Sequence, residues 1–279
     1  MADDMRPQLG AFHQGYMITP HLDKLASQGL LFENAYTQFA YCAPSRNSFL
    51  TGRRPERTRC LNFLTDFRQQ HGSNWTSLPQ FFLNAGYFTS AAGKLYHDGM
   101  DDPASWSFPS NQTKWYSNVS GDVCDEYHNY CRVTPRSVVP FTDEDLVLGE
   151  GLSRMQTAHA SGKPWFVGIG VHRPHWPSRL PANFTGPELY PTGVLPPAFP
   201  KGIPGAPWMS GGYQDGDYRN PALGCPNCSA PEADMVEYRR WYYAAVTYAD
   251  HMLGMALDQL VAFGPDVFNN TIVVFHSDQ

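Results

Sequence analysis

The sequence has few charged residues and no long apolar run. Only 16% of its 279 residues are charged, against 42% that are hydrophobic. No stretch approaches the roughly 20 consecutive apolar residues that a membrane-spanning helix needs. The formal net charge of −6 provides no general attraction to nucleic acid or to an anionic membrane surface. We therefore expect neither as a partner, and an anionic ligand would need a local positive pocket.

The sequence also lacks an internal repeat, a low-complexity tract and a break in composition that would separate two domains. Its length suffices for one large hydrophobic core. Helical patterns alternate with short apolar runs that have the length of buried strands. This alternation predicts a single α/β domain over residues 1–279, with a mostly parallel central sheet flanked by helices.

No signal peptide precedes Met1, although the chain is rich in N-glycosylation sequons. Chance would give roughly one or two, so the excess indicates a glycoprotein of the secretory pathway, lysosomal or extracellular. The two observations agree if the chain is a piece truncated at both ends, which is our expectation. The six sequons begin at Asn74, Asn111, Asn118, Asn183, Asn227 and Asn269.

Six cysteines are too few for a disulfide scaffold, but four of them form two closely spaced pairs. Cys124 and Cys131 bracket a short polar loop, and Cys225 and Cys228 form a CxxC; both pairs predict disulfides in an oxidising compartment. A CxxC can also be half of a zinc site, although no second CxxC with a histidine lies nearby. Cys60 is most simply a buried apolar residue.

The remaining cysteine, Cys42, starts the segment CAPSRNSFLTGRR at residues 42–54. Pro44 suits the first turn of a helix, whose free N–H groups and positive dipole end would face Cys42. Arg46, one turn further, adds a rigid fork of donors. The segment predicts an oxyanion pocket with a nucleophile precursor at its mouth. The arginines between Arg53 and Arg59 fit either a solvated face or a binding surface.

Polar side chains follow each predicted strand. Lys94 and His97 follow the strand at 87–93, and His172 and His175 follow the strand at 164–171. Asp278 follows a predicted buried strand at 271–275, and an inferred strand would precede Asp3 and Asp4. Parallel α/β sheets place their chemistry at the carboxyl ends of the strands. Each group also has a plainer interpretation. Asp3 and Asp4 could be solvated, Lys94 could lie on the surface, His97 could stack on another ring, and one of His172 and His175 could pack outside the site.

The remaining segments predict the flanking layers. Helices are expected at 20–26, capped by Thr19, and at 78–83, 143–159 and 232–263, the last with a possible break at Gly254. A short strand is expected at 30–36. Residues 98–142 form an excursion from the sheet, and the proline-rich residues 174–231 are expected to wrap the rim of the active-site face.

Residues 42–46 (CAPSR) and 50–53 (LTGR) match the signature of the type I sulfatases. The segments 19–26 and 93–94 and the order of the strand ends agree with this resemblance, which covers the whole chain. The residues at 93–97, 106–109, 171–175 and 243–250 resemble the sulfatases that act on sulfated uronic acids. The resemblance implies the alkaline-phosphatase-like sulfatase fold, with the C-terminal subdomain missing.

The resemblance also implies a role for each candidate. Cys42 would be converted to Cα-formylglycine by a dedicated formylglycine-generating enzyme, and Arg46 and Lys94 would hold that group and the sulfate. His97 would orient the hydrated aldehyde, and His172 would protonate the leaving alcohol. One Ca²⁺ ion would be bound by formylglycine together with Asp3, Asp4, Asp278 and Gln279. In the family, the position of Gln279 usually holds histidine or asparagine.

The implied activity is hydrolysis of a sulfate ester on a uronic acid, of the iduronate 2-sulfate type, in glycosaminoglycans such as heparan or dermatan sulfate. A sulfatase of other specificity, a phosphoester or phosphonate hydrolase of the same superfamily, and a non-catalytic glycan-binding relative are the alternatives. Because the family carries a further catalytic lysine and a subdomain beyond the last metal ligand, we expect residues 1–279 alone to be a poor enzyme.

Overall fold

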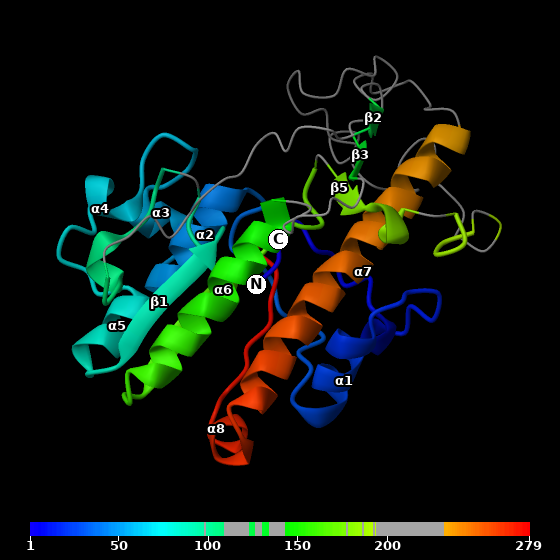
Figure 1. Cartoon of the computed structure of the whole chain (residues 1–279). Helices are drawn as coiled ribbons and strands as arrows, with labels where there is room; N and C mark the ends of the chain where they lie inside the picture. Colours follow the sequence, from blue (N-terminus) through cyan, green and yellow to red (C-terminus); the bar gives the residue numbers. More distant parts are fainter. Residues whose placement is uncertain are drawn as a thin grey trace.

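The computed structural model describes residues 1–97, 99–108, 123–125, 130–133, 143–176, 178–185, 187–191, 193 and 232–279. It contains eight α-helices and five strands in these residues (Figure 1). The helices are α1 (Pro20–Gln28), α2 (Cys42–Thr51), α3 (Pro55–Thr58), α4 (Phe67–Gln70), α5 (Leu78–Asn84), α6 (Asp143–Ala160), α7 (Glu232–Ala262) and α8 (Pro265–Asn269). The strands are β1 (Phe88–Gly93), β2 (Val123–Asp125), β3 (Tyr130–Val133), β4 (Trp165–Gly170) and β5 (Ser178–Pro181).

The central sheet is parallel and is extended by both ends of the chain. β1 pairs with β4 in parallel, from Phe88 opposite Trp165 to Gly93 opposite Gly170. Residues 1–3 then run beside the continuation of β4, with a parallel bridge from Asp3 to Pro174, and residues 276–278 run beside them, with a parallel bridge from Ala2 to Ser277. The order across the sheet is therefore 88–93, 165–174, 1–3 and 276–278, and all four segments end at one edge.

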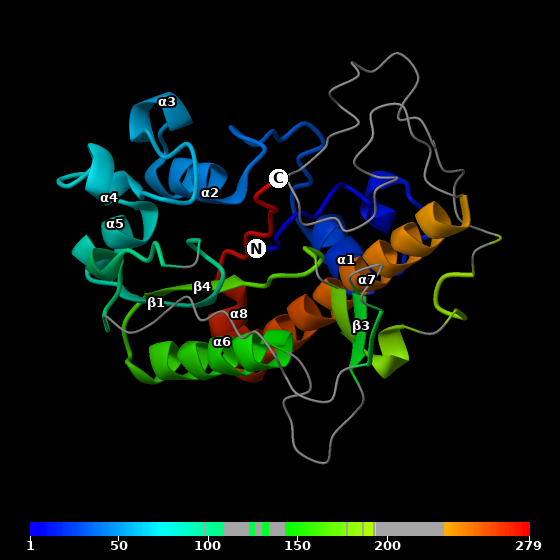
Figure 2. The ribbon, with the colours of Figure 1, turned by 90° about the horizontal axis from the view of Figure 1, so that it is seen from above.

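Helices cover both faces of this sheet. α6 packs on both β1 and β4, and α5 packs on the same strands; Figure 2 shows α6 on one side of the strands and α2 and α5 on the other. The predicted parallel α/β fold is confirmed. β3 forms a second, small sheet, antiparallel to β2 and parallel to β5.

α7 is one unbroken helix, without the predicted interruption at Gly254. A Cβ at that position would lie 2.5 Å from the His21 ring. The glycine therefore allows α1 to pack closely against α7. Of the apolar side chains on α7, Ala245 and Met252 are buried, whereas Met255 is 41% exposed.

Two predicted strands are wrong. Residues 30–36 form no strand and are exposed, with Leu30 87% and Phe32 72% exposed. Residues 271–275 are extended without being a paired strand, and Ile272 is 90% exposed. An apolar run becomes a buried strand only when neighbouring backbone pairs with it, and no described segment pairs with either run.

Most other local predictions are confirmed with small shifts, and Cys60 is buried as a free thiol. Thr19 differs: its side chain does not cap α1 but accepts a hydrogen bond from the Gly10 N–H (3.0 Å) and donates to Asp23 (3.1 Å). The backbone pairs Cys124 opposite Cys131, while Cys225, Cys228 and most of the expected rim at 174–231 lie outside the described residues. Among the described helices, none has the length and apolar character to cross a membrane.

The start of α1 is held by a residue of α7. The Asp250 carboxylate is buried and accepts hydrogen bonds from the backbone N–H groups of Leu22 (2.6 Å) and His21 (3.2 Å). These two N–H groups belong to the first turn of the helix, where they have no partner within the helix. Asp250 thus supplies the cap that Thr19 does not provide.

Replacing Asp250 by alanine is expected to lower the free energy of unfolding by about 2 kcal/mol, because two buried N–H groups lose their acceptor. Urea unfolding followed by circular dichroism measures the change. Asp258→Ala, at an exposed position of the same helix, is the matched control and should change stability by less than about 0.5 kcal/mol. Equal stability of the two variants would contradict the capping role.

Candidate active site

The candidate residues meet at the carboxyl edge of the parallel sheet, around the start of α2. Cys42 is the first residue of α2, and its sulfur lies within 4.8 Å of carboxylate oxygens of Asp3 and Asp4. Lys94 follows β1, and its Nζ lies 2.5 Å from Asp3. His172, beyond β4, lies 3.4 Å from the same carboxylate. Residues separated by up to 169 positions along the chain therefore form one cluster.

Arg46 lies at the centre of this cluster and is completely buried. Its Nη2 donates to Asp3 (2.8 Å) and its Nε donates to Asp278 (2.9 Å). Its Nη1 donates to the backbone carbonyl groups of Lys94 and Leu95. The guanidinium thus joins α2, the chain start, the end of β1 and the chain end, using the fixed donor geometry that lysine lacks.

The pKa values of the three aspartates differ because their partners differ. Burial alone would raise the pKa of Asp3, but Arg46 and Lys94 hold it well below its ordinary value. Burial, followed by repulsion from Asp3 and Asp278, raises the pKa of Asp4 to about 7. Burial also raises the pKa of Asp278 to about 6, against the opposing effect of Arg46. The cluster therefore holds more carboxylate charge than its two cations neutralise.

Asp4 is held in an uncommon backbone conformation, with φ of 60°. Its N–H donates to the Asp278 carboxylate (3.0 Å), and its carbonyl accepts from the Tyr242 hydroxyl (2.8 Å). Non-glycine residues adopt positive φ only when the surroundings enforce it. The Tyr242 hydroxyl contact joins residues 238 positions apart, and local sequence pattern carries no sign of it.

Gln279 lies between Cys42 and Asp4. Its side-chain nitrogen is within 3.4 Å of the Cys42 sulfur, and the amide orientation that best satisfies its neighbours has the oxygen 2.8 Å from the Cys42 N–H and the nitrogen on the Asp4 carboxylate. The first free N–H of α2 is therefore occupied by this amide. Neighbouring Ser45 and Thr37 donate to the Asp278 carbonyl (2.5 and 2.9 Å).

The Cys42 thiol is a poor nucleophile in these surroundings. Burial, together with the negative charge of Asp3, raises its pKa to about 12. Lys94 acts in the opposite direction without overcoming these effects. The helix start was expected to favour an anion at this position, but burial and the charge of Asp3 disfavour a thiolate.

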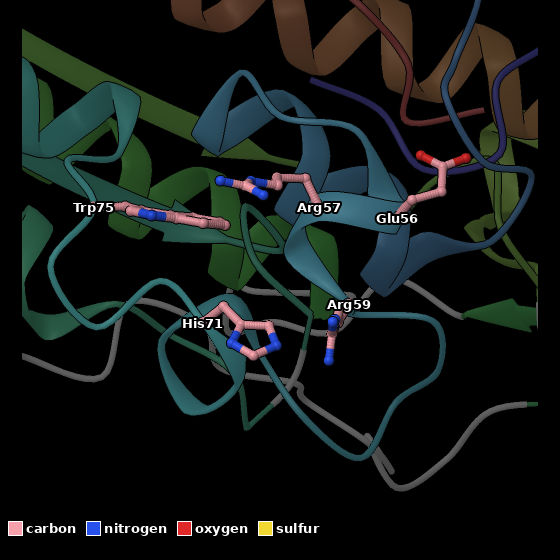
Figure 3. Close-up of a pocket in the computed structure, with 5 residues that line it drawn as sticks. All are labelled: Glu56, Arg57, Arg59, His71 and Trp75. Atoms are coloured by element: carbon pink, nitrogen blue, oxygen red, sulfur yellow. The ribbon is translucent and has the colours of Figure 1, made fainter.

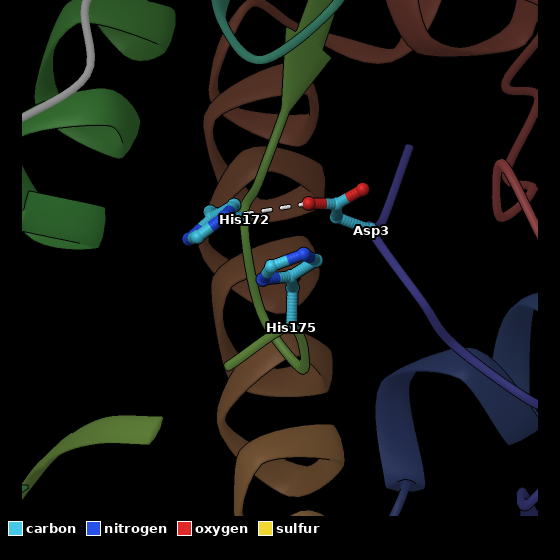
Figure 4. A group of neighbouring side chains, drawn as sticks. All are labelled: Asp3, His172 and His175. Carbon is cyan, nitrogen blue, oxygen red and sulfur yellow. Dashed lines mark ion pairs between the residues drawn. The ribbon is translucent and has the colours of Figure 1, made fainter. Parts of the chain in front are cut away.

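His172 and His175 both lie near the acids, so the plainer interpretation that one of them packs outside the site is wrong; Figure 4 shows both rings near Asp3. The His175 N–H donates to the His172 carbonyl (2.9 Å), which closes a turn, and the two rings stack with centroids 4.5 Å apart. His172 approaches Asp3, and His175 approaches Asp4 (3.5 Å). Burial lowers the pKa of both histidines, that of His172 well below its ordinary value.

The plainer interpretation is wrong for Lys94 and applies in part to His97. Lys94 is only 6% exposed and points into the cluster. Gly93, just before it, has φ of 70°, and a Cβ there would overlap the Gly170 carbonyl, so the chain turns at the strand end through a glycine. His97 stacks on Phe63, with ring centroids 4.3 Å apart. Phe63 in turn contacts Tyr41, the residue before Cys42, with the two rings tilted by 33°.

Comparison with known proteins identifies the family of the chain. The sulfatase family model matches residues 1–279. The chain belongs to the sulfatase family. Human iduronate 2-sulfatase is 35% identical over 301 aligned residues, which cover 100% of this chain and 53% of that protein. The chain thus spans about half the length of this relative.

Solved structures show the same fold at lower identity. A phosphonate monoester hydrolase from Silicibacter pomeroyi superposes with a TM-score of 0.70 at 22% identity, covering 100% of this chain and 61% of that one. A protein solved in complex with its substrate D-glucosamine-2-N,6-O-disulfate superposes with a TM-score of 0.71 at 18% identity, covering 100% of this chain and 64% of that one. These neighbours confirm the predicted fold of the sulfatase superfamily.

Replacing Arg46 by lysine keeps the charge but removes the fork that joins Asp3 and Asp278. We expect a loss of about 3 kcal/mol in the free energy of unfolding, because a buried carboxylate is left without its partner. Chemical denaturation at neutral pH measures this loss. Arg54→Lys, at an exposed arginine nearby, should leave the unfolding midpoint unchanged. A similarly small effect of Arg46→Lys would show that the guanidinium fork does not stabilise the site.

Proposed function

We propose that the protein is a sulfuric ester hydrolase that removes sulfate from a sulfated uronic acid, of the iduronate 2-sulfate type, in glycosaminoglycans. The observation that supports this most is the assembly of Cys42, Asp3, Asp4, Lys94 and a histidine at one sheet edge. An anionic ester bound there would meet cations, a proton donor and a modifiable cysteine together. The match to human iduronate 2-sulfatase supports the substrate class.

The raised pKa of the Cys42 thiol supports its conversion to formylglycine by the formylglycine-generating enzyme. At neutral pH a thiol with a pKa of about 12 is almost entirely protonated and therefore weakly nucleophilic. Formylglycine would supply a hydrated aldehyde as the nucleophile and would allow sulfate to be expelled afterwards. The position of residue 42 at the start of α2, beside Lys94 and the histidines, suits that group.

One calcium ion is the metal that these residues fit best. The carboxylates of Asp3, Asp4 and Asp278 and the amide oxygen of Gln279 are hard oxygen donors, which Ca²⁺ prefers. Burial raises the pKa values of Asp4 and Asp278, and repulsion from neighbouring carboxylates adds to this effect; a divalent cation would relieve the repulsion. A bound ion would also help to neutralise the charge of the sulfate ester.

The surrounding side chains would then bind the ester and transfer a proton. Lys94 would pair with the sulfate oxygens from its position beside Asp3. Arg46 is completely buried and pairs with Asp3 and Asp278, so it would act by positioning these two carboxylates. His97 would orient the nucleophile, and His172 would protonate the leaving alcohol.

The described sequons support a glycoprotein of the secretory pathway, either lysosomal or extracellular. Asn74, Asn183 and Asn269 all lie in the described residues and all are exposed, as acceptors for N-glycans must be. The other three asparagines lie outside the described residues.

The substrate and the nucleophile are tested together in the full-length protein, co-expressed with the formylglycine-generating enzyme. We expect mass spectrometry to find Cys42 converted, and we expect sulfate release from an iduronate 2-sulfate disaccharide to disappear in Cys42→Ala. A Cys60→Ala variant, which changes the other described free cysteine, should keep the activity. An unmodified thiol in an active enzyme would contradict the mechanism.

A substrate panel separates the alternatives. Preference for glucosamine 6-sulfate or choline sulfate would replace the uronic acid assignment, and preference for a phosphonate monoester would place the activity in the other branch of the superfamily. Binding of sulfated disaccharides without turnover of any ester would favour a glycan-binding protein.

The two stacked histidines are distinguished by conservative substitution. If His172 is the general acid, His172→Gln should lower kcat by about 10²- to 10⁴-fold, with a smaller effect on substrates whose leaving group needs no proton. His175→Gln is the matched variant, three residues away in the same turn, and its effect on kcat should be the same for all leaving groups. If the leaving-group dependence appears in His175→Gln instead, His175 is the general acid. The His175 side chain is the more exposed of the two (29% against 10%).

A further inference from the structure

A pocket of about 270 Å³ is lined by residues that follow α2 in the chain, and nothing in the mechanism uses it. Its lining consists of charged and aromatic side chains from α3, from the residue after it and from the loop around α4. Figure 3 shows Arg57 extending towards Trp75, His71 beside Arg59, and Glu56 at the end away from Trp75.

The wall that carries Trp75 is held in place by neighbours. The Arg53 guanidinium lies over the Trp75 indole, 4.3 Å from the ring centroid. Arg68 donates to the carbonyl groups of Gly72 (3.1 Å) and Trp75, and pairs with Asp102 (2.9 Å). A Cβ on Gly72 would lie 2.6 Å from Phe67 and 2.8 Å from Trp75. The indole therefore has a fixed orientation before any ligand arrives.

The polar side chains of the pocket, by contrast, are not used by the fold. Within the part of the chain that the structure describes, the side chains of Arg57, Arg59, His71 and Glu56 form no hydrogen bond and no ion pair. Arg59 has φ of 57° and closes the end of α3 with its N–H on the Pro55 carbonyl (2.7 Å). Glycine is the usual residue for such a turn, and an arginine there adds a cation to the pocket.

We propose that this pocket binds an anionic sugar residue of a sulfated polysaccharide, as a subsite remote from the sulfate that is hydrolysed. Guanidinium groups recognise sulfate and carboxylate oxygens through paired donors. The Trp75 indole offers a flat apolar wall for the face of a sugar ring, and the Glu56 carboxylate accepts from sugar hydroxyls. A bare anion would use only the cations, whereas a charged sugar uses all three kinds of group.

The pocket and the catalytic cluster share no residue, which implies an extended ligand if both are occupied together. Cys42 is the first residue of the ten-residue helix α2, which spans about 15 Å at 1.5 Å per residue, and the pocket residues Glu56, Arg57 and Arg59 follow the last residue of this helix in the chain. A polymer with several sulfated sugars could occupy both places, and this identification of the polymer rests on the proposed function.

The experiment compares the double variant Arg57→Ala/Arg59→Ala with Arg54→Ala in the full-length protein after enzymatic removal of N-glycans, since Asn74 lies next to Trp75. Arg54 is an exposed arginine of the same segment that does not line the pocket. Calorimetry with a heparin-derived hexasaccharide should show affinity reduced about tenfold for each pocket arginine removed, and an unchanged affinity for Arg54→Ala.

Turnover provides a second readout. In the double variant, KM for the hexasaccharide should rise while kcat stays unchanged. The rate of hydrolysis of a monosaccharide sulfate ester should equal that of the wild-type protein. Wild-type affinity in the double variant, or an equal loss in Arg54→Ala, would overturn the proposal. Displacement of the hexasaccharide by an equal concentration of inorganic sulfate would also overturn it, by reducing the pocket to an anion site. If no sulfate ester is hydrolysed at all, the proposed function fails, whereas the calorimetric comparison still decides the pocket.

Discussion

The buried guanidinium of Arg46 is the interaction on which the rest of the structure depends. It joins Asp3 and Asp278, which come from opposite ends of the chain, to the carbonyl groups that follow β1. Two buried carboxylates so close together would repel each other strongly without this cation. The backbone bridges between residues 1–3 and their neighbours bring the acids together, and the positive charge of Arg46 offsets the repulsion between them.

This arrangement divides the work among the charged groups. Arg46 has no exposed surface and organises the carboxylates, while Lys94 and the two histidines each lie beside Asp3 or Asp4. Burial, with repulsion from Asp3 and Asp278, raises the pKa of Asp4 to about 7. Burial, with the charge of Asp3, also raises the pKa of the Cys42 thiol, which disfavours direct use of the sulfur as a nucleophile.

The segment at residues 42–59 contributes both to the candidate active site and to the pocket beside Trp75. Cys42 lies at the start of α2, and the arginines that follow α2 either stabilise the Trp75 loop or line the pocket. Arg53 and Arg68 are used by the fold, whereas Arg57 and Arg59 are not. The cluster of basic residues is therefore neither simply a solvated face nor a single binding surface, because its members have different partners.

The sequence by itself determined the fold class, a helix in the segment after Cys42, the helices at α1, α5, α6 and α7, and the strand ends at which Lys94 and His172 lie. Such features depend on local pattern and on glycine and proline, which act over a few residues. Only the tertiary structure decided that both histidines face the acids, that residues 30–36 and 271–275 are not buried strands, and that Tyr242 holds Asp4. These outcomes depend on contacts between segments far apart in the chain. Local sequence pattern does not show which distant backbone will pair with a strand, which charge will lie beside a carboxylate, or which side chain will cover an apolar run.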